Sequence, residues 1–185
     1  KKCDITQLVS DVHSQFTSPA ELKGISVMLD LPEGEIFASV DREKVCKIIV
    51  NLIGNAVKYA QSRIDIKLVS SDEGFRVSVS DDGPGIPDVE KRKVFEAFYQ
   101  VKDGKSGAVG TGIGLAFSKS LAEAHHGTLS LEDSVYGGSS FVLTLPWGEE
   151  AVSEEPEVVI PDGREAADEE QGTELSGSKF TILLV

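Results

Sequence analysis

The feature that most constrains the fold is a run of apolar residues between positions 41 and 60. They recur at intervals of three and four, the spacing that places side chains on one face of an α-helix. Asp41 stands where the pattern begins, and its carboxylate is a suitable N-cap for the free backbone N–H groups of a first helical turn. The pattern predicts a core-facing helix with this buried stripe: Val45, Ile48, Ile49, Leu52, Ile53, Ala56 and Val57.

A second stripe on the same helix lies beside the apolar one and is polar. Asn51, Asn55, Lys58 and Tyr59 follow one another at steps that gather them on one flank, at about 100° per residue. Carboxamide oxygens suit a Mg²⁺ ion that keeps most of its waters, a lysine can meet a phosphate oxygen, and a tyrosine can lie against a base or ribose. The alternative is a solvated helix edge, which two mid-helix asparagines with low helix propensity disfavour.

An acidic, glycine-rich loop follows the strand expected at residues 75–80. Asp81 opens it, and an ionised carboxylate only accepts hydrogen bonds. Adenine offers an exocyclic amine to such an acceptor, whereas guanine places a carbonyl oxygen there. Gly83 and Gly85 let the backbone approach a flat ring, and Pro84 stiffens the turn between them. The loop predicts a site for ATP in preference to GTP; an acidic Gly-Pro hairpin turn is the alternative.

Three glycines precede the helix expected from Leu115. Gly110, Gly112 and Gly114 expose backbone N–H groups and the positive end of the helix dipole, which together form a cradle for phosphate. Residues 101–109 before them contain few apolar side chains, two glycines and two lysines, so a mobile segment is expected there.

A dinucleotide-binding enzyme is a second interpretation of this glycine cluster. Glu132 and Asp133 follow about twenty residues later, where such enzymes place the acid that binds ribose. Two features oppose it. Leu115 occupies the position of the third glycine, and the residues before Gly110 are typical of a loop rather than a strand.

The remaining elements alternate between strands and helices. Cys3 to Ile5 is expected to form a short edge strand, after which Thr6 would cap a helix that buries an apolar face. Strand-like alternation and turn residues then predict strands at residues 25–30, 63–69, 75–80, 128–131 and 139–145, with a brief apolar piece at 36–39. The order predicts an α+β fold, a two-layer sandwich whose mixed, mostly antiparallel sheet has helices on one face.

Composition excludes several classes of function. The net charge of −13 offers no basic footprint for nucleic acid. Cys3 and Cys46 are isolated, which favours reduced thiols in a cytoplasmic protein and disfavours a zinc site. No apolar run reaches the ~20 residues of a membrane span, so direct membrane contact is not expected.

The acidic charge is concentrated near the end of the chain. Residues 147–178 hold eleven acidic side chains against one arginine and are rich in Gly, Pro and Ser, so they are expected to form a flexible linker after a domain at residues 1–146. Residues 179–185 turn strongly apolar, as in the first strand of a further domain.

In combination, four segments resemble the sensor histidine kinase catalytic and ATP-binding domain. Residues 51–59 look like its N box, residues 81–86 its G1 box, residues 94–100 its F box and residues 110–115 its G2 box, in matching order and spacing. The resemblance covers residues 1–146. It implies the Bergerat ATP-binding fold, shared with gyrase, chaperone and mismatch-repair ATPases, in which ATP lies between helices and a mobile lid.

The resemblance also implies roles for individual residues. Asp81 would bind the adenine amine, and Asn55, helped by Asn51, would hold Mg²⁺. Lys58 would meet a phosphate, so that Asn51, Asn55 and Lys58 form the catalytic set. The other expected contacts to nucleotide are Tyr59, Gly83, Gly85 and Ile86 around the base, and Gly110, Thr111, Gly112, Gly114 and Leu115 around the triphosphate.

The residue at position 51 separates the relatives by chemistry. Hydrolytic members carry a glutamate there as general base, and a carboxamide cannot accept that proton, so direct hydrolysis is expected to be slow. The resemblance implies γ-phosphoryl transfer to a histidine of a dimerisation and phosphotransfer domain that this chain lacks, since His13, His125 and His126 stand in no phosphoacceptor motif. A degenerate module that keeps the fold for protein contacts only is the rival hypothesis.

The final residues suggest a further partner. Residues 181–185 resemble the first strand of a response-regulator receiver, which would make the parent a hybrid two-component kinase. The fragment alone is expected to bind ATP without phosphorylating itself.

Overall fold

The predicted stripe of apolar residues forms the helix α2, Arg42–Tyr59, in the computed structural model, which describes residues 1–101 and 111–148. Asp41 caps it as predicted, because its Oδ1 accepts hydrogen bonds from the backbone N–H groups of Glu43 and Lys44 at 3.1 and 3.2 Å. All seven residues of the predicted stripe are buried. The strongest periodic signal in the sequence is therefore confirmed residue by residue.

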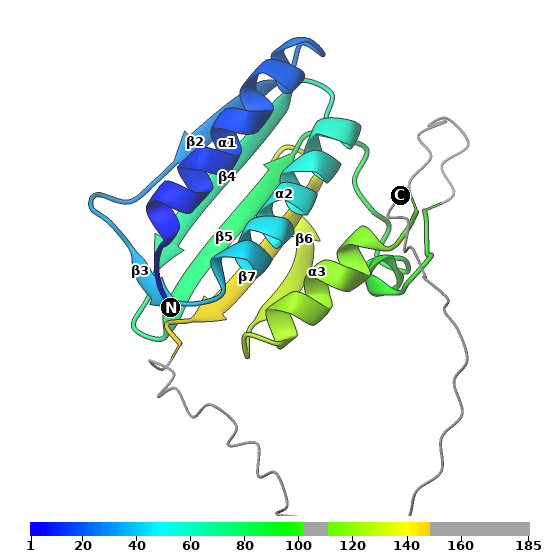
Figure 1. The fold of residues 1–185 in the computed structure, drawn as a ribbon. Coiled ribbons are helices and arrows are strands. Elements are labelled where there is room, and N and C mark those ends of the chain that lie inside the picture. The colour runs from blue at the N-terminus through cyan, green and yellow to red at the C-terminus, as the bar shows by residue number, and fades with distance from the viewer. Residues whose placement is uncertain (102–110, 149–185) are drawn as a thin grey trace, which may run out of the picture. The chain divides into compact units, whose positions relative to one another are not determined.

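A five-stranded sheet forms one layer of the domain (Figure 1). Its spatial order is β2 (Ser26–Asp30), β4 (Arg63–Ser70), β5 (Gly74–Asp81), β7 (Ser139–Pro146) and β6 (Thr128–Asp133). The β2–β4 pair is parallel, and the other neighbours are antiparallel. The predicted mixed, mostly antiparallel sheet is confirmed.

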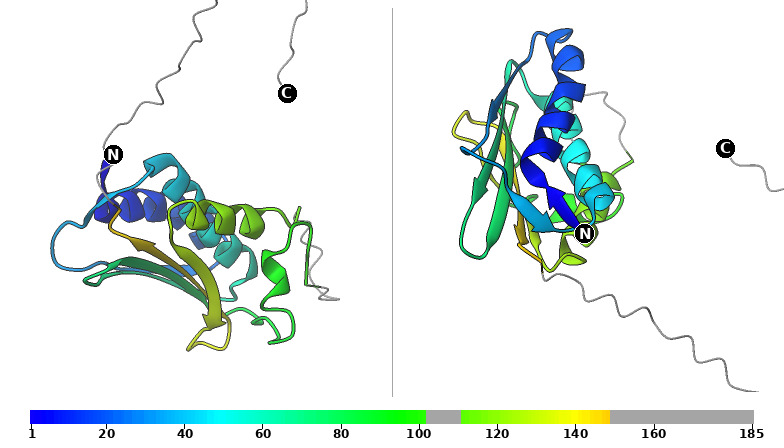
Figure 2. Two further views of the ribbon diagram at one scale, coloured as in Figure 1. Left: turned by 90° about the horizontal axis from the view of Figure 1, so that it is seen from below. Right: turned by 60° about the vertical axis from the view of Figure 1, so that its left-hand side comes forward.

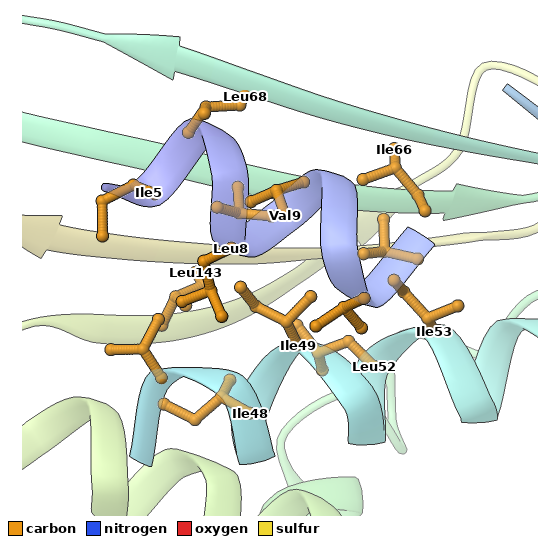
Figure 3. Packing of buried hydrophobic residues seen from close by; sticks show 14 of the residues in the cluster. Ile5, Leu8, Val9, Ile48, Ile49, Leu52, Ile53, Ile66, Leu68 and Leu143 are labelled. Carbon is orange, nitrogen blue, oxygen red and sulfur yellow. The ribbon is translucent and has the colours of Figure 1, made fainter. Parts of the chain in front are cut away.

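The helices cover one face of this sheet (Figure 2). They are α1 (Ile5–Glu21), α2 and α3 (Gly114–Glu123). Side chains from α1, α2 and the inner face of the sheet interdigitate between the layers, as Figure 3 shows for Leu8, Ile49 and Leu143. Full burial of each such side chain stabilises the fold by roughly 1.5 to 3 kcal/mol. The α+β two-layer sandwich is confirmed.

The first helix begins differently from the prediction. Asp4, not Thr6, is the N-cap, because its Oδ1 accepts from the N–H of Gln7 at 3.0 Å. The Thr6 hydroxyl instead accepts from the backbone N–H of Ile36 at 2.9 Å. The reason is a contact distant in sequence: β1 (Lys2–Asp4) pairs with β3 (Phe37–Ser39) in a separate antiparallel ribbon that brings Ile36 to the helix start.

The residue after β7 packs back against the sheet. Trp147 donates its indole N–H to the carbonyl of Asp72 at 3.0 Å, and its ring lies 6.3 Å from that of Phe75. The predicted linker beyond Gly148 and the predicted strand at 179–185 lie outside the described residues. None of the helices in residues 1–101 and 111–148 has the length and apolarity that a membrane span requires.

Asp82 joins the loop after α2 to the end of β5. Its carboxylate accepts hydrogen bonds from the N–H of Gln61 at 2.8 Å and from the N–H and hydroxyl of Ser62 at 3.0 and 2.6 Å. Burial by itself raises the pKa of Asp82, but the hydrogen bonds from Ser62 and Gln61 outweigh it and hold that pKa well below its ordinary value. Their stabilisation is complete above the ordinary value of 3.8 and is lost as the pH falls through the lower folded pKa.

Replacing Asp82 with asparagine is expected to lower the free energy of unfolding by roughly 1 to 2 kcal/mol at pH 7, because Gln61 and Ser62 lose a charged acceptor. The deficit is expected to shrink as the pH falls below about 4, because the Asp82 carboxyl binds a proton in the unfolded wild-type chain at a higher pH than in the folded protein. Chemical denaturation of both proteins at pH 7 and across pH 5 to 2.5 measures this. Equal stability at pH 7 would contradict the role of Asp82.

Candidate functional site

The C-terminal half of α2, the loop after β5, the aromatic segment at 94–101 and the start of α3 enclose a cavity of about 410 Å³. This volume is in the range of small-molecule sites. Ten of the thirteen predicted site residues line it: Asn55, Lys58, Tyr59, Asp81, Gly85, Ile86, Thr111, Gly112, Gly114 and Leu115. Segments that are distant in the sequence thus meet at one cavity, as the sequence predicts.

The other three predicted site residues are not found among the residues that line the cavity. Gly110 lies outside the described residues, as does most of the segment expected to be mobile. Gly83 and Asn51 are described but are absent from the lining. Each of these two contacts a residue that does line the cavity.

A second hollow, of about 760 Å³, lies at the opposite end of α2, beside Lys1, Lys2 and Arg42. It is lined by none of the predicted residues and by both acidic and basic side chains. The residues predicted to contact nucleotide are therefore found at the smaller cavity and not at this hollow.

Asp81 lies at the end of β5 with 3% of its surface exposed. Its Oδ1 accepts hydrogen bonds from the N–H groups of Gly83 at 2.8 Å and Ser139 at 3.3 Å, while Oδ2 accepts none from the described residues. Burial raises the pKa of Asp81, and the two backbone hydrogen bonds offset this only in part. One fixed oxygen and one free oxygen make this carboxylate an oriented acceptor at the cavity wall.

Two glycines allow the chain to close behind Asp81. A Cβ at Gly138 would lie 2.4 Å from both the carbonyl oxygen and Oδ1 of Asp81, and a Cβ at Gly83 would lie 2.7 Å from Oδ1. No side chain fits in either place. Gly83 therefore supports the carboxylate from behind. Gly138 was not among the predicted site residues; its place as the second glycine of a pair before a strand was the available signal.

The flank of α2 presents an amide, an ammonium and a phenol to the cavity. Lys58 Nζ lies 4.9 Å from the centroid of the Tyr59 ring, and the tyrosine is 41% exposed. No three acidic, histidine or cysteine side chains come together within the described part of the chain. The Asn55 carboxamide lines the cavity and could supply one hard oxygen ligand, which suits a Mg²⁺ ion held mainly by phosphate oxygens and water.

The glycine turn before α3 packs directly against the aromatic segment. Gly112 has a φ of +69°, its carbonyl accepts from the N–H of Phe98 at 2.9 Å, and a Cβ there would lie 2.7 Å from the backbone of Phe98. None of the described side chains caps the N-terminus of α3 at Ile113. The first N–H groups of α3 are therefore available to an anion at the cavity.

Sequence reasoning missed several lining residues. Ser139 and Phe141 reach the cavity because β7 pairs with β5, which no local pattern reveals. In the aromatic segment, Phe95 packs edge-on against Phe141 with ring centroids 6.4 Å apart, while Val94, Tyr99 and Gln100 line the cavity.

Asn51 faces α3. Its Nδ2 donates a hydrogen bond to the hydroxyl of Ser118 at 2.9 Å, and its Oδ1 would lie 2.4 Å from a Cβ at Gly114. Ser118 is a nearly fully buried polar residue with 1% of its surface exposed. Nothing in the sequence singled it out, because its partner comes from another helix.

The fold and the site together define a nucleotide-binding domain: a two-layer sandwich in which an acidic acceptor, an amide-bearing helix and a glycine turn surround one cavity. Residues 40–149 match the family described as histidine kinase-, DNA gyrase B-, and HSP90-like ATPase. The chain belongs to this family of ATPases. The proteins that are similar to it in sequence include sensor histidine kinases.

Two relatives illustrate this similarity. The chain is 37% identical over 151 residues to the sensor histidine kinase TmoS of Ectopseudomonas mendocina, covering 79% of this chain and 15% of TmoS. It is 35% identical over 147 residues to the sensor histidine kinase RppB of a Synechocystis strain, covering 78% of this chain and 32% of RppB. The chain thus spans a third or less of the length of these relatives.

Solved structures agree with the fold. The catalytic domain of histidine kinase ThkA superposes with a TM-score of 0.71 at 24% identity, over 80% of this chain and 97% of that domain. The ATP-binding domain of PrrB from Mycobacterium tuberculosis has a TM-score of 0.65 at 29% identity, over 80% and 97%. Full-length ShkA in complex with AMPPNP has a TM-score of 0.70 at 28% identity, over 80% of this chain and 31% of ShkA.

Proposed function

We propose that residues 1–146 bind Mg-ATP and present its γ-phosphoryl group to a histidine in a separate domain, as the catalytic domain of a two-component sensor histidine kinase. The observation that carries this proposal is the single cavity at which Asp81, Asn55 and the glycine turn meet. Family membership supports the nucleotide, and the sensor kinases among the relatives support the reaction.

At the base end, Asp81 Oδ2 accepts a hydrogen bond from the adenine amine. Oδ1 is held by Gly83 and Ser139, so the free oxygen stays oriented toward the cavity without rearrangement on binding. Tyr59, Gly85 and Ile86 form the adjoining wall on which a flat ring can lie. A guanine would bring a carbonyl oxygen against the carboxylate, so the site discriminates against GTP.

At the phosphate end, the N-terminus of α3 and Lys58 meet the triphosphate. The part of the cavity wall next to the start of α3 carries little side-chain bulk, since it is formed by Thr111, Gly112 and Gly114. None of the described side chains caps this helix start. Asn55 would hold Mg²⁺, which when bound neutralises charge on the transferring phosphoryl group. Gly110, which lies outside the described residues, and Leu115 complete the proposed cradle.

The γ-phosphoryl group is retained for a protein nucleophile because the helix offers no general base for water. Asn51 stands where hydrolytic relatives carry a glutamate, and its amide is engaged by Ser118. Among this chain's histidines, Nδ1 of His125 donates to the carbonyl of Leu121 at 2.7 Å while its Nε2 accepts from the N–H of Asp41 at 3.2 Å. We infer that the phosphoacceptor histidine belongs to a separate dimerisation and phosphotransfer domain, and that a receiver follows in a larger cytoplasmic assembly.

Calorimetric titration of the full chain with Mg-ATP and with Mg-GTP tests the proposal. Binding of ATP and much weaker binding of GTP are expected. No measurable ATP affinity would support the degenerate interaction module, and binding of NAD instead of ATP would support the dinucleotide enzyme. Addition of a histidine-containing phosphotransfer domain from a sensor kinase, with radiolabelled ATP, then tests the transfer step against the chain alone.

Replacing Asn55 with alanine is expected to weaken ATP binding roughly 5- to 10-fold in the presence of Mg²⁺, because the proposed metal loses its protein oxygen. In EDTA the same variant is expected to bind ATP almost as the wild type does. Calorimetry under both conditions measures the difference. An equal loss in EDTA would argue against a metal role for Asn55.

A further inference from the structure

The contact between α2 and α3 depends on one amide. Asn51 Nδ2 donates to Ser118 Oγ at 2.9 Å, and Asn51 Oδ1 packs where a Cβ on Gly114 would lie only 2.4 Å away. Gly114 and Ser118 are four residues apart, so they share one face of α3. The amide of Asn51 therefore touches α3 at two successive turns.

This contact reaches the cavity through Gly114. Gly114 is the first residue of α3 and lines the cavity, whereas Asn51 and Ser118 do not line it. Because Gly114 has no side chain, the Asn51 amide lies directly against the α3 backbone. This contact sets how closely the first turn of α3 approaches α2. Ser118 is buried, so without Asn51 its hydroxyl would lose this hydrogen-bond partner.

We propose that Asn51 is a positioning residue, which through Ser118 and Gly114 fixes the anion-binding start of α3 at the distance from α2 that a bound triphosphate requires. The inference rests on the proposed function and deepens it. It replaces the expected role of Asn51 as a second metal ligand, because the amide nitrogen is committed to Ser118 and the amide oxygen faces the Gly114 backbone. Asn55, which does line the cavity, remains the proposed ligand.

A double-mutant cycle separates the two roles. Asn51→Ala, Ser118→Ala and the double variant of the full chain are titrated with ATP and with adenosine, each in Mg²⁺ and in EDTA. Loss of one hydrogen bond is expected to weaken ATP binding about 2- to 10-fold in each single variant, equally in both buffers. The double variant is expected to be no weaker than Asn51→Ala. Adenosine, which lacks phosphates, is expected to bind all variants alike.

Ser120→Ala is the matched control. It removes the same hydroxyl from the same helix, but Ser120 is exposed, and its hydroxyl donates to the carbonyl of Ala116 at 3.2 Å within α3. ATP affinity is expected to stay at the wild-type value. Losses that appear only in Mg²⁺ and add in the double variant would overturn the proposal in favour of a metal ligand. Equal losses of adenosine and ATP would overturn it in favour of a general structural role.

Amide hydrogen exchange gives a readout that needs no nucleotide. Asn51→Ala and Ser118→Ala are both expected to speed exchange across residues 112–118, and Ser120→Ala is not. Unchanged exchange in that segment would overturn the positioning role even if ATP binds. A wild-type chain that fails to bind ATP would instead refute the proposed function, while the exchange result would still decide whether Asn51 holds the start of α3.

Discussion

Replacing Asp81 with asparagine is expected to lower the affinity for ATP about 10- to 150-fold, equivalent to a loss of roughly 1.5 to 3 kcal/mol of binding free energy. The effect is expected to be large because the change acts on a buried acceptor at the cavity wall. Oδ1 of Asp81 accepts from Gly83 and Ser139, and the asparagine oxygen is expected to take over these two hydrogen bonds. Its NH₂ group would then replace Oδ2 and confront the adenine amine, donor against donor.

The same geometry predicts a change in base preference. An amide NH₂ at this position can donate to the carbonyl oxygen of guanine, so the ratio of ATP to GTP affinity is expected to fall in Asp81→Asn. Calorimetry with both nucleotides measures this. Asp82→Asn is the matched control, because it removes an adjacent carboxylate that bonds to Ser62 and Gln61 and does not line the cavity. Unchanged ATP affinity in Asp81→Asn would remove Asp81 from the adenine site.

Replacing Gly112 with alanine is expected to weaken ATP binding about 10- to 100-fold, the equivalent of one or two charge-assisted hydrogen bonds lost at the phosphates. Two effects combine. The φ of +69° disfavours any residue with a Cβ by about 1 kcal/mol or more, and that Cβ would lie 2.7 Å from the backbone of Phe98 and 2.8 Å from the carbonyl oxygen of Tyr99. The turn must shift, and with it the start of α3.

Gly24→Ala separates the two effects. Gly24 has a similar φ of +72°, but a Cβ there meets nothing within 4 Å. This control is expected to lose a little stability and no ATP affinity, as thermal melting and calorimetry will show. In Gly112→Ala, adenosine binding is expected to fall less than ATP binding, because the proposed site for the base is at Asp81 and not at the glycine turn. Retention of wild-type ATP affinity in Gly112→Ala would exclude the glycine turn from the phosphate site.

Local patterns in the sequence predicted much of the fold. The helix from Asp41 has its predicted cap and all of its predicted buried residues, because a three-four repeat of apolar side chains can be satisfied only by one helical face against a core. The strands β4 and β5 also lie where the sequence predicts them, within one residue at each end; in β4, Ile64, Ile66 and Leu68 alternate with other residues and are buried on one face. These signals lie within one element and need no distant partner.

The features that were missed depend on pairing between distant segments. Threonine is a common helix N-cap, but the Thr6 hydroxyl accepts from the N–H of Ile36, which the pairing of β1 with β3 places beside it. Asp4 is the N-cap instead. Ser139 contacts Asp81 only because β7 lies beside β5, fifty-eight positions later in the chain. Ser118 has no distinguishing local pattern in the sequence, because its partner, Asn51, lies on α2 and contacts it only where α3 packs on α2.

The sequence by itself determined the elements and the chemical groups that this protein brings to a nucleotide: an acid after a strand, amides and a lysine along a helix flank, and glycines before another helix. Tertiary structure alone decided which of these groups share a wall of the cavity and which stand behind it. Gly83 and Gly138 support the carboxylate, and Asn51 turns to α3. The physical reason is that helical and strand periodicity fix the face on which a side chain lies, whereas its partner is chosen when whole elements pack and every buried polar group must find a hydrogen bond.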